Sequence, residues 1–171
     1  MGMNELGKPS GQRPAPSKPP MIGGRVVSGL AYLEAMARGE VPQAPFCDLL
    51  GARLTEVSEG RAVFRCQASA RHYNTWGVVH GGLAAMLVDS ATGLAVLSTL
   101  PIGHRATTVE LKVNFTRPIA AETGWMDCVG TMIHRGRRIA TAEARLLDPE
   151  GRLLAHGTAT CLVFELGRPV E

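Results

Sequence analysis

The longest apolar stretch of the chain, Leu83 to Leu100, follows directly after His80-Gly81-Gly82. This run is long enough for a helix of about five turns. It is apolar on nearly all sides, so most of its surface must be covered by other elements. Asp89 is its only charged residue. Because an unpaired carboxylate in apolar surroundings is costly, Asp89 indicates either a structural partner or chemistry.

The two sides of this predicted helix differ in the size of their side chains. The face that carries Asp89 is mostly small, whereas the opposite side is a predicted core stripe. A small face lets a ligand or a partner helix approach the carboxylate closely. The alternative is a packing seam in which Asp89 bonds to a neighbouring strand. The Asp89 face comprises Gly82, Ala85, Met86, Thr92, Gly93 and Val96, and the core stripe comprises Leu83, Leu87, Ala91, Leu94 and Leu97.

The glycine pair at the start of the helix points to an oxyanion site. First-turn N–H groups have no partner within a helix, and the helix dipole favours negative charge there. Gly81 and Gly82 are expected to leave these N–H groups open to a substrate oxygen, about two turns from Asp89.

Two short helices and several strands are predicted around the long helix. Ser28 and Gly39 are expected to cap and end a helix over residues 28–38, and Pro42 and Pro45 precede a helical turn at 46–50. Alternation of apolar and polar residues predicts the strands. These are residues 52–57, 62–68, 107–116, 124–133, 138–147 and 153–164.

The order of these elements predicts an α+β fold, in which a curved antiparallel sheet wraps around one long central helix. Residues 25–165 are expected to form this single domain, with 25–50 as a helical cover segment. Residues 1–24, rich in Gly, Pro and Ser, are a predicted disordered tail, and 166–171 a C-terminal tail.

Composition narrows the class of protein. A chain of 171 residues with 45% apolar residues suits one globular domain, and a net charge of +3 is too small to indicate nucleic acid binding. Without a secretory signal, and with Asp89 inside the apolar run, we expect a cytoplasmic protein that does not enter a membrane. Four cysteines without metal-ligand spacing are predicted to be reduced core residues: Cys47, Cys66, Cys128 and Cys161.

The segment 74–93, NTWGVVHGGLAAMLVDSATG, resembles the hotdog-fold acyl-CoA thioesterases of the PaaI type (phenylacetic acid degradation), which are related to the 4-hydroxybenzoyl-CoA thioesterases. The segments TVELKVNFTRPI and HRGRRIATAEARLLDPEGRLLAHGTAT extend the resemblance over roughly residues 46–165. It implies a hotdog fold, an acyl-CoA substrate, and no metal or cofactor beyond the coenzyme A of that substrate. It also implies a homodimer or a homotetramer (a dimer of dimers), with each site at a subunit boundary.

The resemblance assigns a catalytic role to four positions. Asp89 matches the catalytic carboxylate, and Gly81 matches the residue whose N–H polarises the thioester carbonyl. In the family these two groups come from different subunits. Asn74 matches a side chain that positions the thioester or the attacking water, and Thr108 matches a residue that assists the water. Thr108 alternates with Val109, so it should face away from the core unless a bulge turns it inward.

The hairpin from His134 to Ile139 matches the loop that carries the phosphate end of CoA, and arginines bind phosphates well. A solvated hairpin tip is the alternative. The predicted substrate-binding residues are His80, Gly82, Phe115, His134, Arg135, Gly136, Arg137 and Arg138.

The leading hypothesis is hydrolysis of a small or medium acyl-CoA, with an aryl-acetyl group as one candidate by family analogy. Asp89 would act as general base or as nucleophile, and the sequence leaves this open. Local hydrogen bonding by His80 and a turn role for Asn74 are the structural alternatives. The acyl pocket is expected beneath the cover segment, around Met86 and Trp76.

Three other functions compete with hydrolysis: a non-catalytic acyl-CoA sensor, a hotdog dehydratase or hydratase, and a domain that only dimerises. The lone Asp89 favours an enzyme over a sensor, and the N…HGG…D spacing disfavours a dehydratase. Two subunits are expected to pair along the strand 107–116, whose unpaired edge would otherwise favour aggregation.

Overall fold

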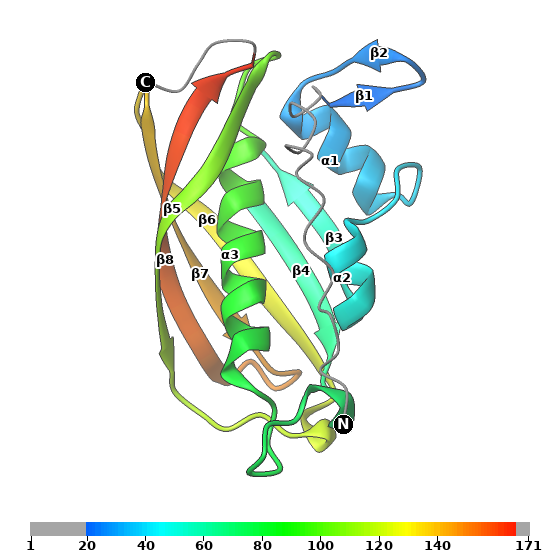
Figure 1. Cartoon of the computed structure of the whole chain (residues 1–171), viewed down its shortest axis with the longest axis vertical. Coiled ribbons are helices and arrows are strands. Elements are labelled where there is room, and N and C mark those ends of the chain that lie inside the picture. Colours follow the sequence, from blue (N-terminus) through cyan, green and yellow to red (C-terminus); the bar gives the residue numbers. More distant parts are fainter. Residues whose placement is uncertain (1–19, 167–171) are drawn as a thin grey trace, which may run out of the picture.

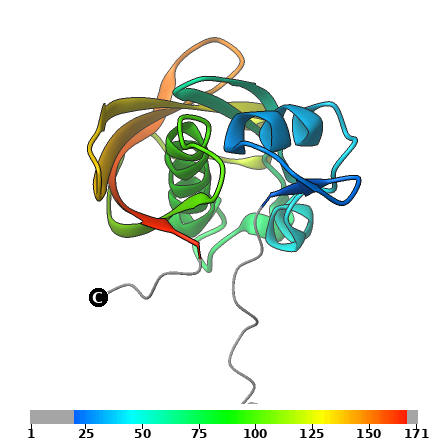
Figure 2. The same cartoon turned by 90° about the horizontal axis from the view of Figure 1, so that it is seen from above.

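The computed structural model describes residues 20–166, in which an antiparallel sheet of order β3-β4-β6-β7-β8-β5 curves around the long helix α3 (Figures 1 and 2). This is the predicted hotdog arrangement. The helices are α1 (Gly29–Ala37), α2 (Pro45–Leu50) and α3 (Gly81–Leu97), with short 3₁₀ turns η1 (Ala70–His72) and η2 (Ala121–Thr123). The strands are β1 (Met21–Ile22), β2 (Arg25–Val26), β3 (Ala52–Ser58), β4 (Arg61–Gln67), β5 (His104–Phe115), β6 (Trp125–Arg135), β7 (Ile139–Leu147) and β8 (Leu153–Glu165).

Small residues on the concave face of the sheet allow α3 to lie close to it. In β7, for example, Ala140, Ala142 and Ala144 point inward and are buried. At Gly130 of β6 a Cβ atom would overlap the carbonyl of Ala91 in α3. This strand therefore needs glycine there, because the helix backbone occupies the space of a side chain.

Helix α3 is buried on most of its circumference, as its composition requires. Leu83, Leu87 and Ala91 of the predicted core stripe are buried. The predicted faces need two corrections. Leu94 of the core stripe is only partly buried, whereas Thr92 and Val96, grouped with Asp89, are fully buried. Both side chains pack into the core beside the stripe. The open face around Asp89 therefore contains fewer residues than the three-, four- and seven-residue spacing predicts.

The helix ends at Leu97, three residues before the apolar run does. The Ser98 hydroxyl donates to the Ala95 carbonyl at 2.7 Å, and the Thr99 hydroxyl donates to the Val96 carbonyl at 2.8 Å. The Ser98 bond gives the Ala95 carbonyl of the last turn a donor, while the Val96 carbonyl also accepts the Thr99 N–H at 3.0 Å. Pro101 then prevents the helix from continuing.

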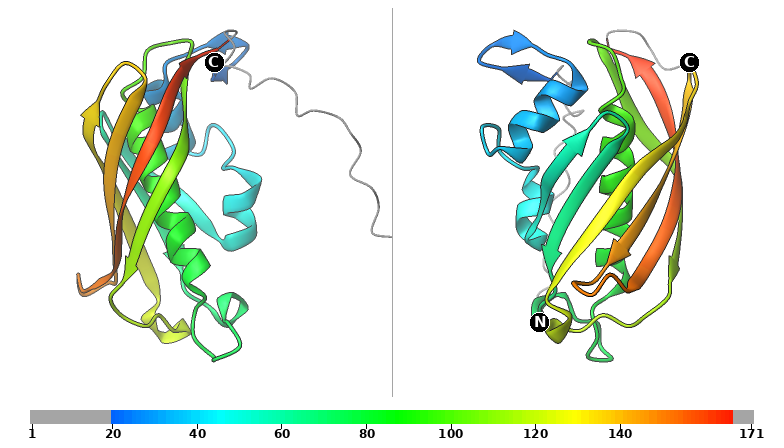
Figure 3. Two further views of the ribbon diagram at one scale, coloured as in Figure 1. Left: turned by 60° about the vertical axis from the view of Figure 1, so that its left-hand side comes forward. Right: turned by 180° about the vertical axis from the view of Figure 1, so that it is seen from behind.

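The two edges of the sheet differ. Helices α1 and α2 pack beside β3 (Figure 1), and the Gln43 side chain accepts the Leu54 N–H at 3.0 Å, so that part of the β3 edge is covered. Strand β5 pairs with β8 alone within the described residues, and its other edge is open. The convex face carries no helix (Figure 3, right).

The predicted strands and helices agree with the structure within a few residues, and one prediction is wrong. Residues 1–19 and 167–171 lie outside the described part of the chain. Within the predicted disordered tail, however, Met21–Ile22 pairs with Arg25–Val26 to form a small hairpin, β1–β2. Two short strands around Gly23-Gly24 give too little alternation to be recognised in the sequence. The predicted N-cap Ser28 is confirmed: its hydroxyl accepts the Ala31 N–H at 3.2 Å.

All four cysteines are free and buried, as predicted. No helix among residues 20–166 is long and apolar enough to cross a membrane.

Candidate active site

Asp89 opens into a cavity of about 350 Å³ between the exposed side of α3 and the start of β5. Its Oδ1 is buried and has no hydrogen-bond partner in the described part of the chain. Such an atom costs free energy in the folded protein unless a ligand or a further subunit uses it. The cavity is lined by Asp89, Ser90, Gly93, Leu94, Leu97, Arg105, Ala106, Thr107 and Thr108.

Thr108 lines this cavity because β5 contains a bulge. The pairing of β5 with β8 shifts register between Thr108 and Glu110, so Val109 is the extra residue and is 57% exposed. The bulge lets Thr108 share the inward side with Leu111, which strict alternation forbids. The Thr108 hydroxyl lies 4.0 Å from the buried Cys161 sulfur. Alternation alone predicts that Thr108 faces away from the core, but the bulge turns it inward.

At the N-terminus of α3, the backbone N–H of Gly81 can still donate to a ligand. The Gly82 N–H donates to His80 Nδ1 at 2.8 Å, and the Leu83 N–H donates to the His80 carbonyl at 3.0 Å. Gly81 is the first helical residue, and its N–H has no acceptor within the helix. The prediction of two open N–H groups is therefore wrong for Gly82, because the His80 ring caps it. The local role of His80 is the one that the structure supports.

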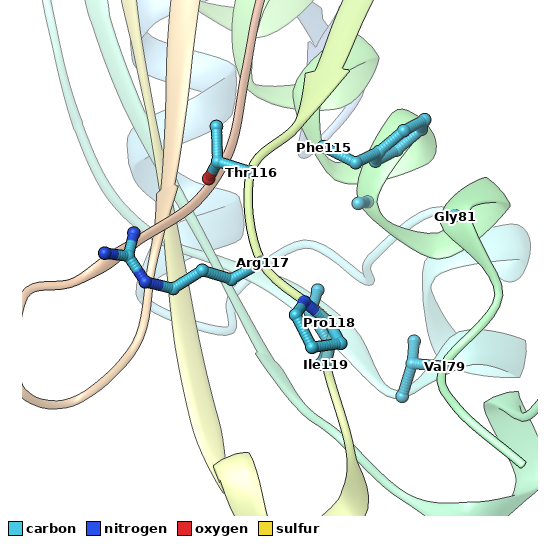
Figure 4. Close-up of a pocket in the computed structure, with 8 residues that line it drawn as sticks. Val79, Gly81, Phe115, Thr116, Arg117, Pro118 and Ile119 are labelled. Atoms are coloured by element: carbon cyan, nitrogen blue, oxygen red, sulfur yellow. The ribbon is translucent and has the colours of Figure 1, made fainter.

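Gly81 borders a second cavity, of about 460 Å³, shown in Figure 4. The Phe115 ring lies beside Gly81, where a Cβ atom would stand 3.1 Å from the ring edge. Arg117 lies on the far side of this cavity and donates to the Leu153 carbonyl at 2.7 Å. The walls are otherwise mostly apolar: Val79, Ala84, Pro118 and Ile119.

Asp89 and Gly81 therefore belong to different cavities of one chain. They are eight residues apart on one helix, about 12 Å along its axis. A carbonyl that is attacked near Asp89 would need its oxyanion donor within about 3 Å of the same carbon's oxygen. Asp89 and Gly81 of one chain therefore lie too far apart to act on the same carbonyl group.

Asn74 is turned into its own loop. Its side-chain oxygen accepts the Trp76 N–H at 2.9 Å and the Val78 N–H at 3.4 Å, and these bonds shape the loop that leads to His80. This is the turn role named as the alternative, and it leaves only the amide NH₂ to face a ligand.

The hairpin between β6 and β7 closes through the Gly136 N–H, which donates to the Ile139 carbonyl at 2.8 Å. Its cationic and imidazole side chains are exposed: His134, Arg135, Arg137 and Arg138. The sheet register places this hairpin at the end of the molecule where α3 finishes and β5 begins, far from Gly81.

The expected acyl pocket beneath the cover segment stays a prediction. The Asp89 cavity is lined by neither the cover segment nor Met86, and Trp76 is 87% exposed at the tip of its loop. Arg105, which no sequence pattern singled out, also lines the Asp89 cavity, and burial lowers its pKa. Its position three residues before Thr108 was the available signal. The described residues hold no group of three or more His, Cys, Asp or Glu side chains with the spacing of a metal site.

Comparisons with known proteins identify the family to which this chain is similar. The sequence model of the thioesterase superfamily matches residues 77–155. Human acyl-coenzyme A thioesterase 13 is 29% identical over 110 residues, which cover 63% of this chain and 76% of that protein. The medium/long-chain acyl-CoA thioesterase YigI of Escherichia coli is 25% identical over 134 residues, covering 70% and 85%. The solved structure of a phenylacetic acid degradation-related protein from Ralstonia eutropha is 30% identical, with a TM-score of 0.69, covering 77% and 98%.

Proposed function

This chain belongs to the thioesterase superfamily, and we propose that it is an acyl-CoA thioesterase whose active sites form between two subunits. The observation that carries the proposal is the buried, unpartnered Oδ1 of Asp89 beside a cavity that also receives the Thr108 hydroxyl. Its substrates would be small or medium acyl-CoA molecules, with aryl-acetyl groups among the candidates.

The proposed reaction uses Asp89 as a general base. Asp89 takes a proton from a water molecule that the Thr108 hydroxyl helps to hold, and the water oxygen attacks the thioester carbon. The Gly81 N–H, at the positive end of α3, stabilises the oxyanion that forms. The tetrahedral intermediate then collapses, the C–S bond breaks, and the leaving CoA sulfur receives the proton from Asp89.

A second subunit would complete each site. The open β5 edge is the natural surface for pairing, since two β5 strands can join in antiparallel fashion about a two-fold axis. Such an axis sets the two α3 helices side by side in opposite directions. Gly81 of one subunit can then approach Asp89 of the other, which the 12 Å separation forbids within one chain.

The other predicted substrate-binding residues would each contact one part of the acyl-CoA. The Asn74 amide NH₂ would meet the thioester region, because its oxygen is used within its own loop. The hairpin residues Arg135, Arg137 and Arg138 would bind CoA phosphates. The Phe115 ring beside Gly81 would border the reacting carbonyl.

The test is thiol release from phenylacetyl-, benzoyl-, butyryl- and octanoyl-CoA by three proteins: the wild type, Asp89→Asn and Gly81→Pro. Proline suits the first position of a helix, and the extended His80 backbone tolerates it, so Gly81→Pro removes the N–H with little cost to α3. Gly81→Ala is its control, since it adds a Cβ near Phe115 but keeps the N–H. We expect about 100-fold or greater losses for Asp89→Asn and Gly81→Pro, and a small loss for Gly81→Ala.

Mixing the two inactive variants tests the shared site. In a mixed dimer, one of the two sites receives both changes and the other receives neither. Random mixing should therefore restore about a quarter of the wild-type activity. If each site used Asp89 and Gly81 of the same chain, mixing would restore nothing.

A non-catalytic acyl-CoA sensor is the competing function. It would bind CoA but show the same negligible thiol release in the wild type and in Asp89→Asn for every thioester. That result would overturn the enzymatic proposal.

A further inference from the structure

Arg105 lines the Asp89 cavity but has no role in the proposed reaction. It precedes Thr108 by three strand residues, about 10 Å, and lines the same cavity next to Leu97 at the end of α3. Its side chain is partly buried, and the Tyr32 hydroxyl of α1 is one of the groups that act on it electrostatically. A guanidinium that is partly withdrawn from water beside a cavity is a strong binding group for an anion or a carbonyl oxygen.

The sheet brings the arginine hairpin to the same end of the molecule. Ala106, next to Arg105, pairs with Val163 of β8, and the Val163 N–H donates to the Arg138 carbonyl at 2.7 Å. Strand β5 and the hairpin are thus separated only by β8, a distance of about 10 Å across the sheet. Arg105 therefore lies between the Asp89 cavity and the exposed arginines at 135, 137 and 138.

We propose that Arg105 binds the phosphate-bearing end of the CoA pantetheine arm, so that CoA runs from Asp89 past Arg105 to the hairpin. This inference rests on the proposed thioesterase site. The pantetheine arm contains two amide links and is about as long as four to five extended residues, about 15 Å. This length matches the strand distance from Thr108 to Arg105 plus the reach of the arginine side chain. The anionic group nearest to the thioester would then meet Arg105, and the remaining phosphates would meet the hairpin.

Arg105 already takes part in an interaction within the chain. This contact does not prevent phosphate binding, because a guanidinium carries five N–H donors in a planar fork. It can keep one contact and still offer two parallel N–H groups to a phosphate.

The experiment compares each acyl-CoA with the same acyl group on N-acetylcysteamine, which keeps the thioester but lacks the phosphates. Arg105→Met should raise KM for every acyl-CoA about 10- to 100-fold, as expected for a lost charge-assisted hydrogen bond, and change the N-acetylcysteamine thioesters less than about twofold. Arg105→Lys should recover part of the loss. Arg145→Met, which removes an exposed arginine from the convex face, is the matched control and should change neither.

Two results would overturn the proposal. An equal loss with both kinds of thioester would indicate a structural role for Arg105. A loss confined to acyl groups that end in a carboxylate would indicate that Arg105 recognises the acyl group.

Binding of free CoA, measured by calorimetry with the wild type and Arg105→Met, does not depend on turnover. A 10- to 100-fold weaker Kd for the variant supports the proposal even if no thioester is hydrolysed, which separates it from the proposed function. An unchanged Kd contradicts it.

Discussion

The Thr108 hydroxyl lies 4.0 Å from the thiol of Cys161, on the cavity side of β5, because Val109 is expelled as the extra residue of a bulge. Cys161 is fully buried, and the pKa of its thiol is raised by burial and by the negative charge of Asp89, although the Thr108 hydroxyl acts in the opposite direction. Asp89, Thr108 and Cys161 are thus neighbours, and in the proposed reaction Thr108 would guide a water molecule to Asp89.

Replacing Thr108 by valine should lower kcat about 10- to 100-fold, since the shape is kept and the hydroxyl is lost. Stability should change by less than about 0.5 kcal/mol, because the hydroxyl makes only a long contact with sulfur. Thr108→Ser, which keeps the hydroxyl, should retain most of the activity. A fully active Thr108→Val would exclude a role for this hydroxyl in catalysis.

Asp89→Asn should lose activity without losing stability. A buried carboxylate oxygen that has no partner costs free energy, so its neutral replacement should raise the free energy of unfolding by about 1 kcal/mol or leave it unchanged. Asp127→Asn is the contrasting change, since Asp127 forms a two-bond ion pair with Arg65 at 2.7 Å and its loss should cost up to about 1 kcal/mol. Urea unfolding of both variants tests this, and a marked destabilisation by Asp89→Asn would show that Asp89 is structural.

The sequence predicts the fold well because its strongest signals are local and consistent. The apolar run 83–100, the alternating strands and the Asp148-Pro149-Glu150-Gly151 turn each specify one element, and the Gly151 N–H indeed donates to the Asp148 carbonyl at 2.9 Å. The site is predicted less completely, because its decisive features depend on contacts between elements.

Three features of the site illustrate this limit. The bulge that turns Thr108 inward depends on the pairing of β5 with β8, which alternation along one strand does not reveal. The His80 ring caps Gly82 because of its rotamer, and a sequence motif does not specify that. Arg105 joins the Asp89 cavity only after α3 and β5 have packed together.

The pH dependence of stability should include a contribution from His72. This buried ring lies 3.1 Å from the Leu50 carbonyl and 3.3 Å from the Ser69 hydroxyl, and burial, together with the nearby Arg71, lowers its pKa below the ordinary 6.5. The unfolded chain then binds a proton more readily than the folded one, so stability is complete above about pH 6.5 and falls as the pH drops toward the folded pKa. Urea unfolding between pH 5 and 8 should show this slope for the wild type, and His72→Gln should flatten it. An unchanged slope in the variant would assign the effect to other groups.

The four cysteines should react slowly with thiol reagents while the protein is folded. Burial raises the pKa of each thiol, and the thiolate is the reactive form. At pH 7.5 we expect a reaction with a disulfide reagent at least about tenfold slower than in the urea-unfolded chain, where thiols have their ordinary reactivity. Fast reaction of one native thiol would reveal local opening at that cysteine, which single Cys→Ser variants would identify.

Two glycines, one in β6 facing α3 and one within α3, should respond oppositely to alanine. A Cβ at Gly130 would overlap the Ala91 carbonyl, so Gly130→Ala must push α3 away from β6 and should cost about 1 to 3 kcal/mol. Gly93 has open space around its missing Cβ and lies in the interior of α3, so Gly93→Ala should stabilise the helix by up to about 1 kcal/mol.

Because Gly93 also lines the Asp89 cavity, the methyl group of Gly93→Ala should raise KM for acyl-CoA substrates if CoA or its acyl group occupies this cavity. Thermal unfolding and the thioester assay on the two variants separate these effects, and a Gly93→Ala protein with gained stability and unchanged KM would show that the substrate lies elsewhere.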